Sequence, residues 1–234
     1  GDSQWNTGMS AFVINPYAFG AANITDFAFV ASTTNNDNAS TYTFTAASIG
    51  AADSNRRVVV AFGARAGSNT AFSISSATIG GTSATILVQK DATDDGGNKD
   101  MAALLIADVP TGTTADVVVN MSRSGVRAAM ATYRIVSTSA LTVIDTADGS
   151  GSASVNMSLD VQPSSVALAV GASRYFDATG HTYSGIATRD ANVSVESNAA
   201  WFSCASEQPT TTATNTITVT NNTYWLTTVA ASLK

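Results

Sequence analysis

The chain has 234 residues, of which 44% are hydrophobic and only 12% are charged, and its net charge at pH 7 is −6. No cluster of lysine and arginine offers the basic face that nucleic acid binding needs, so that function class is excluded. No apolar run approaches the ~18 residues of a membrane span, and the N-terminus lacks the charged-then-apolar layout of a signal peptide. Cys204, in the apolar run WFSCA, has no partner for an intrachain disulfide and is expected to be a buried small residue rather than a reactive thiol.

Residues 1–23 differ from everything that follows. They carry Trp5, Phe12, Tyr17 and Phe19 and show neither strand nor helix periodicity. An extended segment with this many aromatic residues needs a surface to cover it. Two interpretations are open: the segment packs on its own domain, or it is an arm that docks on a neighbouring subunit. Because the second half of the chain has no equivalent, we favour the docking arm.

From Thr25 onward the sequence consists of short segments rich in β-branched residues, separated by Gly, Asn, Asp and Ser, which predicts strands without helices. The first series of strands is expected at Phe27–Ser32, Tyr42–Ser48, Arg57–Arg65, Phe72–Ile79, Ala84–Gln89, Met101–Val109, Ala115–Met121 and Arg127–Val136. The second is expected at Leu141–Thr146, Ser154–Val161, Ser165–Arg174, His181–Thr188, Asn192–Glu196, Ala200–Ser206, Thr214–Thr220 and Tyr224–Leu233.

The two series match in order, which indicates an internal duplication. FAFVAS corresponds to LTVIDT, TYTFTAAS to SVNMSLDV, ADVVVNMS to TNTITVTN, and AAMATYRIV to LTTVAASLK. The central strands read RVVVAFGAR and VALAVGASR, each with one bulky face and one nearly bare face. We expect superposition of the copies to align Phe62 with Val170. We also expect a bare face, Ala61 and Gly63 or Ala167 and Gly171, to be covered by the other half or by a neighbouring subunit.

Eight short strands in about a hundred residues, repeated, predict an all-β fold of two tandem jelly-roll-like antiparallel β-sandwiches. The expected boundaries are an N-terminal arm at 1–23, a first repeat at 24–138 and a second repeat at 139–234. The joint near Ser137–Ala140 is too short to be a flexible linker. The halves should therefore pack firmly on each other, or share sheets in one larger sandwich.

The stretches TYTFTAASIG, RRVVVAFGAR, ISSATIGGTSAT and ADVPTGTTADVVV resemble a pattern found in virion proteins of tailed bacteriophages and prophages. FVINPYAFG is similar to short leaders of such proteins, and LDVQPSSVALAVGASR onward matches how they continue. The resemblance covers the chain from about Phe12 to its end. It implies a structural protein of a phage particle: a capsid decoration or head-fibre protein, or a tail component. It carries no catalytic motif to transfer.

The residues themselves offer little chemistry. His181 is the one histidine and Glu196 and Glu207 are the two glutamates, and no nucleophile elbow accompanies them, so the chain is not expected to be an enzyme or to hold a cofactor. The acidic run Asp91–Asp100, DATDDGGNKD, could offer oxygen ligands to Ca²⁺, but it fits no EF-hand pattern and is better interpreted as a hairpin loop, so no metal site is assigned.

A second group of residues fits sugar recognition. Tyr175, Asp177, His181 and Tyr183 flank a glycine turn and could stack on and hydrogen-bond a sugar ring; the alternative places Tyr183 in the core and Tyr175 at the end of the sandwich. Two hypotheses follow. The first is a virion structural protein that attaches to other capsid or tail proteins and forms a homo-oligomer, such as a trimer or another symmetric cluster. The second is a receptor-binding tail protein or carbohydrate-binding module that recognises a host surface glycan.

Overall fold

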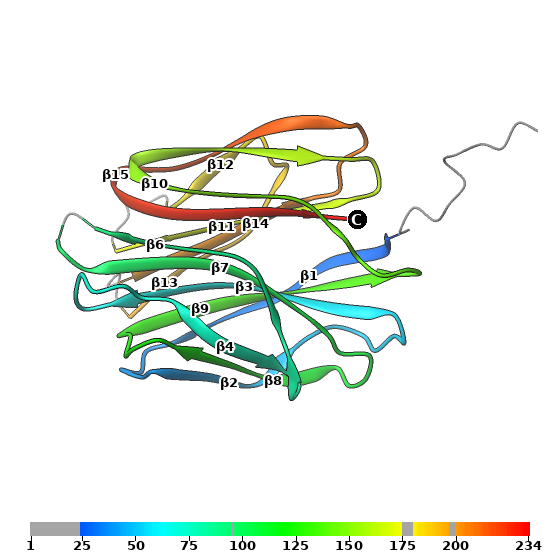
Figure 1. The fold of residues 1–234 in the computed structure, drawn as a ribbon, viewed down its shortest axis with the longest axis horizontal. Coiled ribbons are helices and arrows are strands. Elements are labelled where there is room, and N and C mark those ends of the chain that lie inside the picture. Colours follow the sequence, from blue (N-terminus) through cyan, green and yellow to red (C-terminus); the bar gives the residue numbers. More distant parts are fainter. Residues whose placement is uncertain (1–23, 95, 175–179, 197–199) are drawn as a thin grey trace, which may run out of the picture.

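The computed structural model describes residues 24–94, 96–174, 180–196 and 200–234. All regular structure among them is antiparallel β-strand, arranged in three sheets (Figure 1), and the all-β prediction is confirmed. The predicted arm at 1–23 lies outside the described residues.

The first half of the chain forms two sheets. One has the strand order β1-β9-β3-β7-β6 and the other has the order β2-β8-β4-β5. The strands are β1 (Ile24–Asn35), β2 (Thr41–Ser48), β3 (Arg56–Ala66), β4 (Ile74–Ile79), β5 (Thr82–Ser83), β6 (Thr85–Thr93), β7 (Lys99–Asp108), β8 (Thr114–Met121) and β9 (Arg127–Ser137).

The second half forms a single sheet of order β10-β15-β11-β14-β13, with β12 paired to β15. Its strands are β10 (Val143–Val161), β11 (Val166–Ser173), β12 (Thr182–Ser184), β13 (Thr188–Val195), β14 (Ala200–Glu207) and β15 (Ala213–Leu233). The long strands β10 and β15 pair with each other along their whole length. The C-terminal part of β15 also pairs with β11, whereas its N-terminal part pairs with β12.

The order of strands is the same in both halves. The strand order β1-β9-β3-β7-β6 corresponds to β10-β15-β11-β14-β13. The order β2-β8-β4 corresponds to the C-terminal part of β10, the N-terminal part of β15, and β12. The sequence predicted separate strands at Leu141–Thr146 and Ser154–Val161, and at Thr214–Thr220 and Tyr224–Leu233. In the structure each pair is one continuous strand, because β10 and β15 stay paired through Gly149 and Gly151, which lie opposite Thr228 and Leu226.

The layers stack on one another and enclose three hydrophobic cores (Figure 1). The first core lies between the two sheets of the first half and includes Val60 and Phe62. The third lies inside the second half, where β10 and β15 fold back over β11 and β14, and includes Leu159 and Ala169. The second core lies between the halves and joins Ala61 and Leu104 to residues such as Phe202. The firm packing of the two halves, predicted from the short joint, is therefore observed.

The contacts between the halves are reciprocal. Strand β7 packs on β15 and β9 packs on β14, while β6 packs on β10 and β1 packs on β13; β3 and β11 pack on each other at the centre. Since β1 corresponds to β10, β6 to β13, β7 to β14, and β9 to β15, each contact has its counterpart with the halves exchanged. This is the pattern of an isologous, two-fold interface, built here within one chain.

The central strands β3 and β11 differ in which face they turn to this interface. In β3 the bulky residues, among them Phe62, enter the core of the first half, while Ala61 faces the second half. In β11 the bulky residues, among them Val170, face the first half, while Ala169 enters the core of its own half. The expected alignment of Phe62 with Val170 is therefore wrong by one residue, and Phe62 corresponds instead to Gly171.

The expectation that a bare face would be covered is confirmed. Ala61 has no exposed surface, and a Cβ placed on Gly63 would lie 2.7 Å from Cδ2 of Phe202 and 3.4 Å from Cβ of Ala172, both in the second half. Glycine at this position therefore lets the phenyl ring of Phe202 approach the backbone of β3. The face is covered by the same chain, so Ala61→Trp would disturb folding.

Candidate functional site

The candidate docking residues Trp5, Phe12, Tyr17 and Phe19 lie outside the described residues, as do Tyr175 and Asp177 of the candidate glycan site. His181 and Tyr183 are described. His181 has no exposed surface, and Tyr183 is partly buried beside it. The structure therefore brings together two of the four glycan candidates, but it places them inside the second half, and a sugar cannot reach the imidazole of His181.

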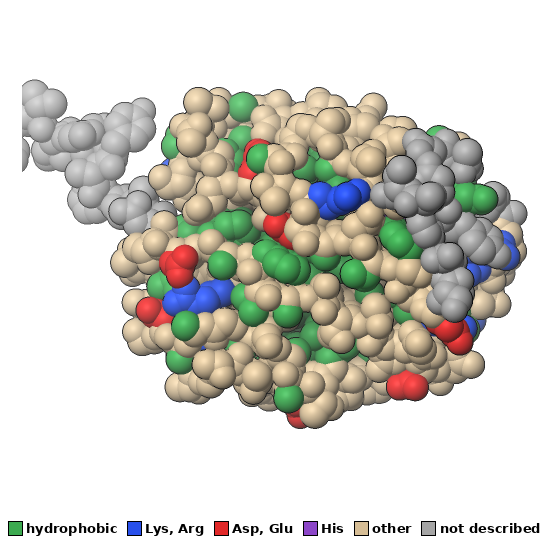
Figure 2. Space-filling view, turned by 180° about the vertical axis from the view of Figure 1, so that it is seen from behind, with side chains coloured by type: hydrophobic (Ala, Val, Ile, Leu, Met, Phe, Trp, Pro, Cys, Tyr) green, Lys and Arg blue, Asp and Glu red, His purple; other side chains and the backbone are tan. Residues whose placement is uncertain are grey.

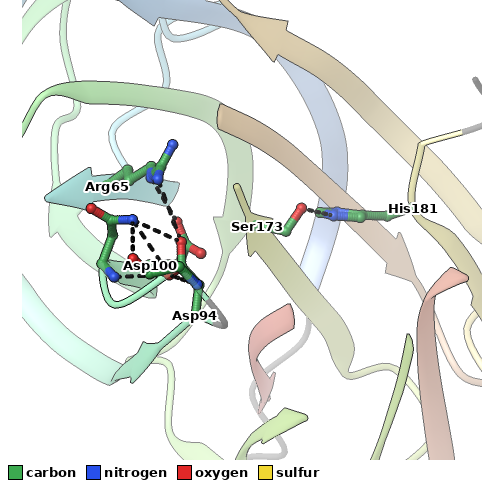
Figure 3. A network of polar contacts seen from close by, with 7 residues as sticks. Arg65, Asp94, Asp100, Ser173 and His181 are labelled. Carbon is green, nitrogen blue, oxygen red and sulfur yellow. Dashed lines mark hydrogen bonds and ion pairs between the residues drawn. The ribbon is translucent and has the colours of Figure 1, made fainter. Parts of the chain in front are cut away.

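His181 is the centre of a buried polar network. Its Nε2 lies 2.8 Å from Oγ of Ser173 (Figure 3), and its Nδ1 lies 2.7 Å from Oγ of Ser203. The hydroxyl of Tyr183 lies 2.6 Å from the same Oγ of Ser203. Arg189 donates to the backbone carbonyl of His181 at 2.7 Å. Both ring nitrogens thus have partners, as a buried imidazole requires.

The electrostatics of this network keep the imidazole neutral. Burial, reinforced by the charge of Arg189, lowers the pKa of His181 from 6.5 to about 3. Burial also raises the pKa of Tyr183 above its ordinary value. A serine next to a neutral histidine resembles part of a catalytic triad, but this serine and histidine are both fully buried, so no substrate can approach the pair. The network is structural.

The network occupies the space that an aromatic side chain fills in the first half. A Cβ placed on Gly171 would lie 3.0 Å from Nδ1 of His181, 3.0 Å from Oγ of Ser203 and 3.2 Å from the hydroxyl of Tyr183. At the corresponding position of β3, the ring of Phe62 fills the core and contacts Tyr42 and Phe44 edge-on or tilted. The equivalent space is therefore filled by an apolar ring in the first half and by hydrogen-bonded polar groups in the second half.

The acidic run at Asp91–Asp100 lies at the tip of the β6–β7 hairpin, as interpreted from the sequence, although its two ends belong to the paired strands. Oδ1 of Asp94 accepts the backbone N–H groups of Gly96 and Asn98, each at 2.8 Å, while its Oδ2 lies 3.4 Å from Nη2 of Arg65 (Figure 3). Oδ1 of Asp100 lies 3.8 Å from Nε of Arg65. These buried carboxylates are balanced by a guanidinium and by amides. Within the described residues, no group of three or more His, Cys, Asp or Glu is placed to hold a metal ion.

A third polar contact lies where the halves meet. The hydroxyl of Tyr133 donates to Oδ2 of Asp190 at 2.9 Å, next to the buried Cys204. Burial raises the pKa of Asp190, although its hydrogen bonds oppose this effect, and burial raises the pKa of Cys204 to about 12. A thiol held in this protonated state is a poor nucleophile, which confirms the expectation that Cys204 is a buried small residue.

An open hollow of the described surface, not foreseen from the sequence, is a groove between the edges of β1 and β2. We call it the edge groove; it is about 360 Å³ in volume and is lined by residues 31–35 of β1 and 43–48 of β2, with Met130 and Thr132 of β9. Among the described residues β1 pairs only with β9, and β2 only with β8, so each borders the groove with an unpaired edge.

Two features of the backbone shape the edge groove. The pairing register shifts between Phe29 and Ala31 on β1, and between Phe44 and Ala47 on β2. At the second bulge Ala46 has φ of 50°, and its N–H donates to Oδ1 of Asp116 at 2.8 Å. Bulges bend edge strands and interrupt their ladders, so the regular stretches of edge that border the groove are short.

The remaining surface carries few charges. Figure 2 shows one face on which polar side chains and backbone dominate and acidic and basic side chains are scattered rather than clustered. No helix among the described residues is long and apolar enough to cross a membrane. No protein-family model matches the chain, and neither a curated protein nor a solved structure was found to be similar to it. The edge groove is the candidate functional site because it is open and is bordered by two strand edges.

Proposed function

We propose that this chain is a structural protein on the surface of a tailed phage particle, a capsid decoration or head-fibre protein. It attaches to capsid or tail proteins through residues 1–23 and forms a homo-oligomer, such as a trimer or another symmetric cluster. The proposal starts from the resemblance of stretches such as TYTFTAASIG and ISSATIGGTSAT to phage virion proteins.

The observation that carries the proposal is the construction of the two halves. Both present polar strands of Thr, Ser and Asn outward, and a hydrophobic core with reciprocal contacts joins them into one block. Such a block suits a particle surface, where a protein must be rigid and needs no moving parts. The polar groups that could perform chemistry, His181 and Ser173, are sealed inside it.

We further propose that each half is a jelly-roll-like sandwich produced by duplication. In the first half β1-β9-β3-β7 form one sheet and β2-β8-β4 the other, as expected when two Greek keys interlock. One strand departs from this plan: β6 pairs with β7, and only the two-residue β5 that precedes it joins β4. The same departure occurs in the second half, where β13 pairs with β14, and a shared irregularity of this kind supports a common origin.

The second hypothesis, a receptor-binding tail protein or carbohydrate-binding module, is less well supported. It needs exposed aromatic and polar groups around His181, and the imidazole is buried. Tyr175 and Asp177 remain its candidates.

The test is immunogold labelling of intact particles made by the phage or prophage that encodes this chain. We expect gold over the head, at regularly repeated sites. Gold at the tail tip would favour the receptor-binding hypothesis, and particles that contain no copy of the chain would contradict both.

A further inference from the structure

We propose that the edge groove accepts residues 12–19 of a second copy of this chain as a short added β-strand. The inference deepens the proposed function, because it assigns the docking place of the N-terminal arm. The site consists of the facing edges of β1 and β2 with Met130 and Thr132 between them.

The borders of the groove favour a strand as the occupant. An edge strand directs unpaired N–H and C=O groups away from its sheet, and an extended peptide satisfies them by adding to the ladder. Both walls of the groove are such edges among the described residues. The bulges at Ala31 and Ala46 limit the added ladder to a few residues, which disfavours open-ended strand addition.

The lining of the groove favours an occupant with large side chains. Its walls carry mainly Ala, Ser and Thr, so the space between the edges is not filled by the groove's own residues. Residues 12–19 read FVINPYAF, with Phe12 and Ile14 two residues apart, and Tyr17 and Phe19 likewise. Alternate residues of a strand point to the same face, so Tyr17 and Phe19 would point into the groove together, and Phe12 and Ile14 would point to the opposite face.

Chain length favours a second copy as the source. Phe19 precedes Ile24 by five residues and can lie at most about 18 Å from it. Ala31, where the groove begins on β1, follows Ile24 by seven residues of strand, or about 23 Å. Phe19 of the same chain therefore falls short of the groove even when the segment is fully stretched. A strand that includes Phe19 can reach the groove only from another copy.

The second half shows what the site looks like when it is closed. There β10 runs unbroken through the corner that β1, a loop and β2 form in the first half. A Cβ placed on Gly149 would lie 2.5 Å from Cγ1 of Val155, so the two arms of β10 are already in contact. An open corner in the half that follows residues 1–23, and a closed corner in the other half, match an arm that exists only once per chain.

The test is disulfide trapping between two full-length variants, Tyr17→Cys and Ser32→Cys, each checked for folding by circular dichroism. They are mixed and oxidised, and mass spectrometry of peptides identifies the mixed disulfide. The control pairs Tyr17→Cys with Ser158→Cys, an exposed position on β10 away from the groove. The native Cys204 does not compete because it is buried.

We expect the Tyr17→Cys and Ser32→Cys pair to give at least a tenfold higher yield of mixed disulfide than the control pair. Equal yields from the two pairs, or no mixed disulfide from either, would overturn the inference. A Tyr17→Cys/Ser32→Cys double variant that closes its disulfide only within one chain would also overturn it. Since particle labelling is independent of this result, gold on the head without trapping would reject the docking place and leave the proposed function standing.

Discussion

The two halves of the chain share a strand order but differ at two equivalent places. At the outer corner, β1 and β2 of the first half are separate strands with a groove between them, whereas β10 of the second half is continuous and closed. In the core, the first half buries Phe62 where the second half has Gly171 and a polar network around His181. The comparison teaches that one strand order accommodates different packing and different surfaces, so the halves can have different tasks within one block.

The largest expected loss of stability comes from an aspartate introduced into the core of the first half or into the core between the halves. Val60→Asp, in the first-half core, and Leu168→Asp, in the core between the halves, bury an unpaired carboxylate at positions with no exposed surface. Each should cost several kcal/mol or more and abolish the folded state. Circular dichroism and solubility report the outcome, with Ser158→Asp on the exposed face of β10 as the control. Soluble folded protein from either core variant would contradict the core assignment.

The next effect tests the imidazole that distinguishes the second half. The folded state holds the pKa of His181 at about 3, below its ordinary 6.5, so the unfolded chain binds the extra proton first as pH falls. The stabilisation is therefore complete above pH 6.5 and is lost progressively as pH falls toward 3. The slope contributed by this group is roughly 1.4 kcal/mol per pH unit.

Urea unfolding between pH 7 and pH 4 measures this slope, and His181→Gln serves as the variant without a titrating imidazole. Asp190, whose pKa is raised, contributes in the opposite direction in both proteins and cancels in the difference. A difference between wild type and variant that does not change with pH would show that His181 is not held neutral.

A smaller effect tests the contact that joins the halves. Gly63→Ala places a Cβ against the ring of Phe202, and such overpacking typically costs about 1–3 kcal/mol. Phe202→Leu in the same chain should remove part of that cost. Urea denaturation of the two single variants and the double variant gives the coupling energy, and we expect it to exceed ~0.5 kcal/mol. Additive effects would mean that the two halves do not meet at this point.

The smallest expected effect compares the two corner bulges. Ala46 and Ala153 both have positive φ, 50° and 66°, at the register shifts of β2 and β10. Glycine relieves this strain but increases the entropy of the unfolded chain, so Ala46→Gly and Ala153→Gly should each change stability by no more than about 1 kcal/mol. Thermal unfolding measures both. A loss of more than 2 kcal/mol at one corner alone would show that the bulges are not equivalent.

Much of the fold follows from sequence because alternation and turn residues are local signals. Most predicted strands match observed ones to within a few residues, and the pairing of ADVVVNMS with TNTITVTN places β8 and the near part of β15 correctly. The alignment of β3 with β11 was predicted one residue out, because Phe62-Gly63 and Val170-Gly171 look equivalent in sequence. Only packing against Phe202 and His181 reveals which face each strand turns inward.

The site was less accessible to sequence reasoning. His181 and Tyr183 beside a glycine turn have the composition of a sugar site, but burial is a long-range property set by β11 and β14. The edge groove depends on two strand edges that come together only in the folded chain, so no local sequence pattern predicts it.

Hydrogen–deuterium exchange of the full-length protein compares the open corner between β1 and β2 with the closed corner of β10 most directly. It is measured at two protein concentrations, one above and one below the dissociation constant of the proposed oligomer. We expect the backbone amides of residues 31–35 and 43–48 to be protected only at the high concentration, where a second copy supplies its arm. The amides of β10 at residues 149–155 should exchange equally at both. Protection at the β1 and β2 edges that does not depend on concentration, or that changes equally at the β10 corner, would contradict the account.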